Sequence, residues 1–246
     1  YRRQRQMCIR DSLKYYKTDK MNKIVIAIDS FKGCLTSEEA GIAVMKGIKT
    51  IFPDCEILLF PIADGGEGML DVLISATQGK YRTLPAHGPL MELIQAQYGI
   101  SGDGQTALIE MAAISGLPLV PKEKRNPMLT TTYGTGELIL DALEQGCRRF
   151  IVGIGGSATN DAGLGMLQAL GFRFLDKRGN LLGTGGKIMS QVASIDTSAV
   201  HPALKETRFT IACDVHNPFC GSDGAAYVFA PQKGADARMV LSLIHI

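Results

Sequence analysis

The sequence lacks the features that direct a protein to nucleic acid, a membrane or a structural metal. Its 26 Lys and Arg residues exceed its 24 Asp and Glu residues by only two, and no block of like charge indicates a nucleic-acid groove or a polybasic anchor. No stretch approaches the roughly 20 apolar residues of a membrane-spanning helix, and the basic N-terminal stretch lacks the apolar segment of a secretory signal. The six cysteines include no CxxC pair. We therefore expect a cytoplasmic protein with reduced thiols and a small-molecule partner.

The two ends of the chain differ from the part between them. Met21 is followed at once by the strand-like run NKIVIAID, and the closing residues LSLIHI have no capping or turn residues around them. We expect residues 1–20 to be a non-native or disordered leader and residues 241–246 to be a foreign tail. The natural product is then expected to begin at Met21 and to continue beyond Val240.

Residues 21–84 alternate between strand and helix patterns. Strands are predicted at Lys23–Ile28 and Glu56–Ile62, and helices at Ser37–Ile51 and Glu67–Thr77. Thr36 and Glu39 form a capping box at the start of the first helix. Two successive strand-to-helix units predict an α/β fold with a parallel sheet and right-handed crossovers.

A second subdomain is expected from about Pro85. The strand-like runs Leu93–Ile100 and Gln105–Met111 flank SGDG, which is turn chemistry and predicts a hairpin. We expect residues 21–84 to be the N-terminal part of a discontinuous α/β domain and residues 85–240 to be a second α/β domain. Further helices are predicted over 136–145 and 161–170, and strands over 150–154, 172–175 and 209–213.

Several loops at the predicted strand ends are rich in glycine and polar residues. In open α/β sheets ligands bind at the carboxyl ends of the strands, where loops lead into helix N-termini. The loops of this kind are Asp29–Thr36, Ala63–Gly68, Gly153–Gly163 and Asp214–Gly221, and a fifth, Asn126–Glu137, also leads into a helix.

The central loop, GIGGSATNDAG, has two ligand interpretations. Gly153, Gly155 and Ala158 fit the GxGxxA dinucleotide fingerprint, with Asp176 at the end of the next strand. The loop also carries hydroxyl, amide and carboxylate groups that suit phosphate oxygens better, which favours a phosphate site. Those side chains belong to Ser157, Thr159, Asn160 and Asp161.

A third interpretation of the same loop is a tight turn with close helix packing through Gly163 and Gly165. No Walker A sequence is present, because the nearest run, GTGGKI, places Ile188 where Ser or Thr must bind magnesium. If the protein binds ATP, the phosphates must be held by a different loop.

Three aspartates directly follow apolar strands: Asp29, Asp64 and Asp214. We expect their carboxylates to meet at one rim, where phosphoryl transfer needs groups that hold Mg²⁺ and accept a proton from the attacking hydroxyl. Each could instead cap the helix that follows it. Lys32 could reach a substrate carboxylate or a phosphate as a mobile charge, or remain a solvated lysine, and Lys233 is a second such cation.

The chain from Met21 to about Val240 resembles the bacterial glycerate kinase family that has neither a Walker loop nor a protein-kinase fold. The matching segments are IAIDSFKGCLTSEEA, PIADGGEG, NPMLTTTYGTGELI, GIGGSATNDAG and CDVHNPFCGSDGAAYVFAPQKGA. The resemblance implies ATP-dependent phosphorylation of D-glycerate to 2-phosphoglycerate, with 3-phosphoglycerate as the other product considered. It also implies a two-domain α/β scaffold with the active site between the domains.

The resemblance also implies site residues. Asp29, Ser30 and Lys32 would lie on the substrate side with Asp64, Gly65 and Gly66, and Asp214 and Asn217 would complete the rim. An anion cradle would come from Gly155, Gly156, Ser157, Asn160 and Asp161, to which the hydroxyl pattern adds Thr159. We expect Asp64 or Asp214 to be the base and both to be magnesium ligands, with Lys32 as a third catalytic residue.

This sequence departs from the family pattern after APQKGA, where a helical region and a TGEGR-type segment are absent. We expect the C-terminal part of the first domain to be missing and residues 21–240 alone to have little kinase activity and poor solubility. Two other functions stay open from the sequence: a dinucleotide-dependent oxidoreductase that uses residues 153–158, and a nonenzymatic sugar-acid binding module. The sequence does not indicate the oligomeric state.

Overall fold

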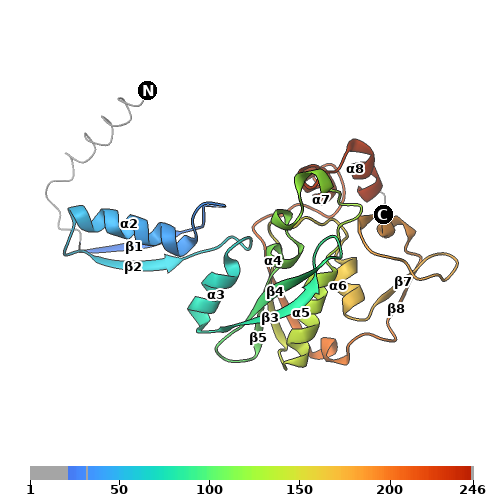
Figure 1. The fold of residues 1–246 in the computed structure, drawn as a ribbon, viewed down its shortest axis with the longest axis horizontal. Coiled ribbons are helices and arrows are strands. Elements are labelled where there is room, and N and C mark those ends of the chain that lie inside the picture. The colour runs from blue at the N-terminus through green and yellow to red at the C-terminus, as the bar shows by residue number, and fades with distance from the viewer. Residues whose placement is uncertain (1–21, 32, 245–246) are drawn as a thin grey trace. The chain divides into compact units, whose positions relative to one another are not determined.

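The computed structural model describes residues 22–31 and 33–244. They form two compact units, one ending at Ile62 and the other starting at Ala63, and Figure 1 labels their helices and strands. The leader expected at residues 1–20 and the candidate residue Lys32 lie outside the described residues.

The first unit is a single strand-helix-strand crossover. Strands β1 (Lys23–Ile28) and β2 (Glu56–Pro61) are parallel, in a register that pairs Lys23 with Glu56. Helix α2 (Ser37–Ile51) connects them and begins with the predicted capping box. In that box the Thr36 hydroxyl accepts the Glu39 N–H at 3.1 Å, and the Glu39 carboxylate accepts the Thr36 N–H at 2.9 Å. The predicted parallel pair, helix and cap are confirmed.

The second unit is built on a five-stranded mixed sheet in the order β3-β4-β5-β6-β9. Its first three strands are antiparallel neighbours, and β5, β6 and β9 run parallel. The bounds are β3 Lys80–His87, β4 Leu93–Ile100, β5 Thr106–Glu110, β6 Arg149–Gly153 and β9 Arg208–Ala212. The β4–β5 pair is the hairpin that SGDG predicts.

Helices cover both faces of this sheet (Figure 1). Side chains alternate between the faces of a strand: Leu108 of β5 packs with Leu70 and Ile74 of α3, whereas Ile109 packs with Ile139 and the rest of α5. The helices of the second unit are α3 (Met69–Thr77), α4 (Ala112–Ser115), α5 (Tyr133–Glu144), α6 (Leu164–Ala169), α7 (Ala225–Phe229) and α8 (Ala237–Ile244). The last two, α7 and α8, pack on each other in a separate cluster. The larger core cluster, on the α5 side, includes the buried aromatic residues Tyr98 and Phe150.

Two strands depart from the expected organisation. Strand β3 was not predicted, because KYRTLPAH contains a proline and several polar residues. Pro85 is tolerated because β3 is an edge strand, where a missing backbone N–H removes no hydrogen bond between central strands. Strand β7 (Arg173–Leu175) is not part of the main sheet but pairs with β8 (Ser194–Asp196) in a separate antiparallel ribbon.

The C-terminal residues pack on the second unit. Helix α8 runs to Ile244, and Leu243 is buried in a cluster with Met189, Ala230 and Val240. The foreign origin expected for residues 241–246 stays a prediction, as do the domain boundaries expected at residues 84 and 240. In the part of the chain that the structure describes, no helix is both long and apolar enough to cross a membrane.

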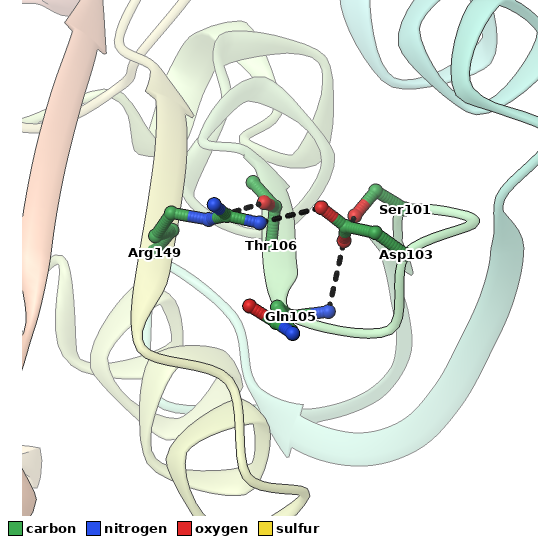
Figure 2. A network of polar contacts seen from close by, with 5 residues as sticks. All are labelled: Ser101, Asp103, Gln105, Thr106 and Arg149. Atoms are coloured by element: carbon green, nitrogen blue, oxygen red, sulfur yellow. Dashed lines mark hydrogen bonds and ion pairs between the residues drawn. The ribbon is translucent and has the colours of Figure 1, made fainter.

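A network of polar contacts links the amino ends of strands β5 and β6 (Figure 2). Arg149 donates to the Asp103 carboxylate at 2.5 Å and to the Thr106 hydroxyl at 3.2 Å. Asp103 also accepts from the Ser101 hydroxyl, the first cause of its lowered pKa, and from the Gln105 N–H. Because the pair is half exposed, it adds little stability, but it fixes the hairpin turn at the edge opposite the carboxyl ends.

Candidate functional site

Two loops of the second unit meet at the carboxyl edge of the parallel strands, beside the end of β9. Residues 153–163, which we call the glycine-rich loop, leave β6, and residues 63–68 lead toward α3 beside them. The Gly155 N–H donates to the Gly65 carbonyl at 3.2 Å, and the Ile154 N–H donates to the Ala212 carbonyl of β9 at 3.4 Å. The structure thus brings the loops of Asp64 and Ser157 together at the end of β9.

Close backbone approach explains three of the glycines. A Cβ on Gly155 would lie 2.8 Å from the Gly66 Cα, and one on Gly153 would lie 2.4 Å from the Gly65 carbonyl oxygen. Gly65 itself has a φ of +89°, and a Cβ there would lie 2.6 Å from the Ala212 carbonyl oxygen. These glycines are needed because protein backbone fills the space that a side chain would take.

Gly156 and Gly165 differ from these three. The φ of Gly156 is +69°, and the nearest atom to a Cβ there is the side chain of Ala112, at 3.2 Å. A Cβ on Gly165 would lie 2.0 Å from the Thr131 hydroxyl oxygen, so the helix-packing interpretation holds for that residue. Gly156 is therefore less crowded by backbone than Gly153 or Gly155, and its N–H belongs to the predicted anion cradle.

Asp161 anchors the glycine-rich loop to the start of α5. Its side chain is 1% exposed, and Oδ2 accepts the Thr132 N–H at 2.8 Å, the Thr132 hydroxyl at 2.9 Å and the Gly165 N–H at 3.2 Å. Oδ1 accepts the Gly163 N–H at 3.2 Å. The Asp161 carboxylate already accepts these hydrogen bonds. We therefore expect Asp161 to contribute to the predicted cradle by holding the loop in shape.

Lys233 is the last residue of the 3₁₀ turn Pro231–Lys233, and its side chain contacts the same loop. Its side chain is 7% exposed, and its ammonium donates to the Ser157 hydroxyl at 2.9 Å and to the Thr159 carbonyl at 2.5 Å. Burial lowers the pKa of this lysine to about 8, and the Asp161 carboxylate partly opposes that shift. The solvated role that is usual for a lysine is wrong for Lys233.

The predicted carboxylates lie in both units. Asp64 Oδ1 accepts the Gly66 N–H at 2.9 Å, and the exposed Asp214 follows β9 in the second unit. In the first unit, Asp29 Oδ1 accepts the Ser30 N–H at 2.7 Å. The common rim expected for all three stays a prediction.

Ser30 and Asn217 have contrasting surroundings. The Ser30 hydroxyl is buried and has no hydrogen-bond partner among the described residues, whereas the Asn217 amide donates to the Asp223 carbonyl at 2.8 Å. Within the described ranges, no group of three or more His, Cys, Asp or Glu side chains is arranged to hold a metal ion.

Glu110 belongs to the same edge and was missed in the sequence. It is the last residue of β5 and is 6% exposed, and its Oε2 accepts the N–H groups of Gly68 and Leu70 at 3.1 and 3.0 Å. Burial raises the pKa of this carboxyl, and the two backbone donors oppose the shift. A carboxylate at the end of the apolar run TALIE was the available signal, and the structure shows that it caps α3.

Asp176 does not occupy the position that a dinucleotide fold requires. Its carboxylate accepts the N–H groups of Arg178 and Asn180 at 2.8 and 2.9 Å and so closes a local turn. The strand that precedes Asp176, β7, lies outside the five-stranded sheet. A ribose-binding carboxylate is expected on the strand next to the fingerprint strand in the same sheet, so the arrangement does not fit the oxidoreductase alternative.

The glycine packing predicts the effect of one methyl group. We expect Gly155→Ala to lower the free energy of unfolding by about 1–3 kcal/mol, because the Cβ must push residues 65–66 away. Gly183→Ala is the matched control, since a Cβ there meets nothing within 4 Å. Urea denaturation of both variants measures the difference. Equal stability of Gly155→Ala and the unsubstituted chain would show that the two loops are not in close contact.

The chain is similar in sequence to known glycerate kinases. The chain is 53% identical over 221 residues to glycerate 2-kinase of Escherichia coli (strain K12), covering 90% of this chain and 58% of that protein. It is 53% identical over 218 residues to glycerate kinase of Bacillus subtilis (strain 168), covering 89% and 57% respectively. The chain thus spans less than two thirds of the length of these relatives.

A solved structure and a family model agree with these relatives. A crystal structure of a proposed glycerate kinase 2 from Salmonella typhimurium LT2 superimposes with a TM-score of 0.81 at 48% identity, covering 91% of this chain and 60% of that one. The model of the glycerate kinase family matches residues 24–245. The α/β fold and the resemblance found in the sequence are confirmed: this chain belongs to the glycerate kinase family.

Proposed function

We propose that this chain carries the phosphate-binding and substrate-binding loops of an ATP-dependent kinase that converts D-glycerate into 2-phosphoglycerate. The observation that carries the proposal is the match to the family over residues 24–245, which includes all the loops at the carboxyl edge. The relative from Escherichia coli bears the name glycerate 2-kinase, which supports the 2-position rather than the 3-position. The partners are then two small molecules, ATP and D-glycerate.

The glycine-rich loop is the part that we assign to the phosphates of ATP. Gly156 is less crowded than its neighbours, and backbone N–H groups of such a loop suit phosphate oxygens. The Ser157 hydroxyl on this loop and the buried Lys233 ammonium, which contacts it from the turn 231–233, add further donors. The fit is chemical: hydroxyl, ammonium and amide groups are all donors, as a polyphosphate requires.

The substrate is assigned to the loops around Asp29 and Asp64. Asp29, Ser30, Gly65 and Gly66 keep the substrate-side roles that the family motifs imply, together with Lys32. The buried Ser30 hydroxyl, which has no partner among the described residues, supports this assignment because buried polar groups are nearly always hydrogen-bonded.

Asp64 and Asp214 are the proposed base and magnesium ligands. Magnesium, when bound, neutralises charge on the phosphates, and it usually takes only one or two carboxylates besides water and phosphate oxygens. Two aspartates at this edge fit that requirement without the larger cluster that a dedicated protein cage needs. One carboxylate would accept the proton of the attacking glycerate hydroxyl.

Ligand binding by the 246-residue chain tests the proposal against both alternatives. At one hundred times its dissociation constant, MgATP is expected to raise the free energy of unfolding by about 2.7 kcal/mol, and D-glycerate to add to this. NAD is expected to have no effect. The Asp214→Asn variant should lose the magnesium-dependent part of the stabilisation by MgATP. MgATP should stabilise the Asp176→Ala variant as much as it stabilises the unsubstituted chain. Stabilisation by NAD, or by D-glycerate but not MgATP, would favour the oxidoreductase or the binding module instead.

The position of phosphorylation has its own test. Phosphorus NMR after long incubation of stoichiometric chain with MgATP and D-glycerate makes even slow turnover visible. We expect the signal of 2-phosphoglycerate. Formation of 3-phosphoglycerate, or of inorganic phosphate alone, would contradict the assigned product.

A further inference from the structure

Lys233 is a buried cation without an ion-pair partner. Its side chain is 7% exposed, and none of the described carboxylates lies within ion-pair distance of its ammonium. Burying a charge without an opposite charge is costly. A site that retains such a charge is suited to bind an anion.

The hydrogen bonds around Lys233 leave donors available. An ammonium can only donate, so the Ser157 hydroxyl oxygen accepts the 2.9 Å bond between them. Ser157 must then give its own proton to another group, and no acceptor for it exists among the described residues. Lys233 has three N–H groups, and two acceptors are found, Ser157 and Thr159. Lysine and serine together therefore keep two donor positions.

The charges around Lys233 do not neutralise it locally. Asp161 is the one carboxylate that raises its pKa, and that side chain is already bonded to the start of α5. Arg125, whose backbone packs against Gly234, directs its guanidinium to the carbonyls of Leu117 and Val120. The neighbouring α7 and the turn 231–233 contribute no charged side chain besides Lys233, and Tyr227 is their one other titratable residue.

The backbone next to Lys233 is held tightly. Gly234 has a φ of +92°, and a Cβ there would lie 2.1 Å from the Arg125 carbonyl oxygen. The lysine thus approaches the glycine-rich loop from a fixed turn, which favours a defined position for the ammonium and for the hydroxyl that it contacts.

We propose that Lys233 is a positioning residue of the phosphate site: it holds the Ser157 hydroxyl as a hydrogen-bond donor and supplies the positive charge for a phosphate group of ATP on the glycine-rich loop. The inference rests on the proposed function. A purely structural lysine would tie the loop to the turn 231–233 without affecting anion affinity, and the pH dependence separates the two roles.

The stability of the ligand-free chain and its affinity for an anion should change in opposite directions with pH, and only the change in affinity separates the two roles. The pKa of Lys233 is about 8 in the folded chain and near 10.5 when unperturbed, so the unfolded chain binds more protons between these values. The free energy of unfolding of the ligand-free chain should therefore rise from about pH 8 to 10. Anion affinity needs the charged lysine, so it should fall over the same range.

The experiment measures sulfate and MgATP binding calorimetrically at pH 7 and pH 9.5. Sulfate is included because its charge does not change in this range. The variants are Lys233→Met, Lys233→Arg and Ser157→Ala, with the exposed Lys177→Met as the charge-matched control. Urea denaturation of each variant confirms that it is folded under the binding conditions.

We expect Lys233→Met to bind both anions about tenfold to a hundredfold more weakly at pH 7, the loss of one charge-assisted hydrogen bond. Ser157→Ala should be intermediate and Lys177→Met unchanged. The affinity of the unsubstituted chain should fall at pH 9.5. That of Lys233→Arg should be largely retained at pH 7 and should not change with pH, because arginine stays charged.

Two results would overturn this inference while leaving the kinase proposal intact. One is that Lys233→Met binds MgATP and sulfate as tightly as the unsubstituted chain. The other is that the loss of affinity at pH 9.5 persists in Lys233→Met and Lys233→Arg. If the unsubstituted chain binds neither probe at pH 7, the assignment of the phosphate site is wrong. The proposed function then fails together with the inference.

Discussion

The candidate site depends on backbone packed directly against backbone. The glycine-rich loop, residues 63–68 and the end of β9 approach each other so closely that Gly65, Gly153 and Gly155 have no room for a Cβ. Parallel strands place these loops at one edge, and the glycines allow the loops to touch. Much of the glycine content that suggests a ligand site in the sequence therefore serves packing, and the phosphate assignment depends on Gly156, Ser157 and Lys233.

Two buried charges of opposite sign shape the glycine-rich loop from different sides. Asp161 collects backbone and hydroxyl donors from the start of α5 and from α6, so its charge is compensated within the protein. Lys233 has only a hydroxyl and a carbonyl as acceptors, and burial lowers its pKa. This asymmetry distinguishes a carboxylate that supports the fold from a cation suited to an anionic ligand.

Local sequence rules predicted the elements that are determined locally. The capping box at Thr36 and Glu39 and the SGDG hairpin follow from nearby residues, and the parallel β1–β2 pair follows from the order strand, helix, strand. The structure has all three. Strand β3 and the separate ribbon of β7 depend on tertiary pairing partners that a local pattern does not contain. For the same reason Asp176 looked like a ribose ligand in the sequence but closes a turn in the structure.

The site was predictable to the level of loops but not of individual roles. The sequence identified the loops of Asp64, Ser157 and Asp214, because glycine and polar residues after apolar strands are visible in it. It did not reveal the burial of Lys233 or the capping role of Glu110, since burial depends on residues far away in the chain. The meeting of Asp29 with Asp64 and Asp214 remains a prediction from their positions after apolar strands.

We propose that the glycine-rich loop, which follows the carboxyl end of β6, holds the phosphates of ATP. A crystal structure of this chain with magnesium and a nonhydrolysable ATP analogue tests it most directly. We expect phosphate oxygens within hydrogen-bonding distance of the Gly156 N–H and the Ser157 hydroxyl. Phosphates bound elsewhere, for example at the GTGGKI segment, with the glycine-rich loop making no contact, would contradict it.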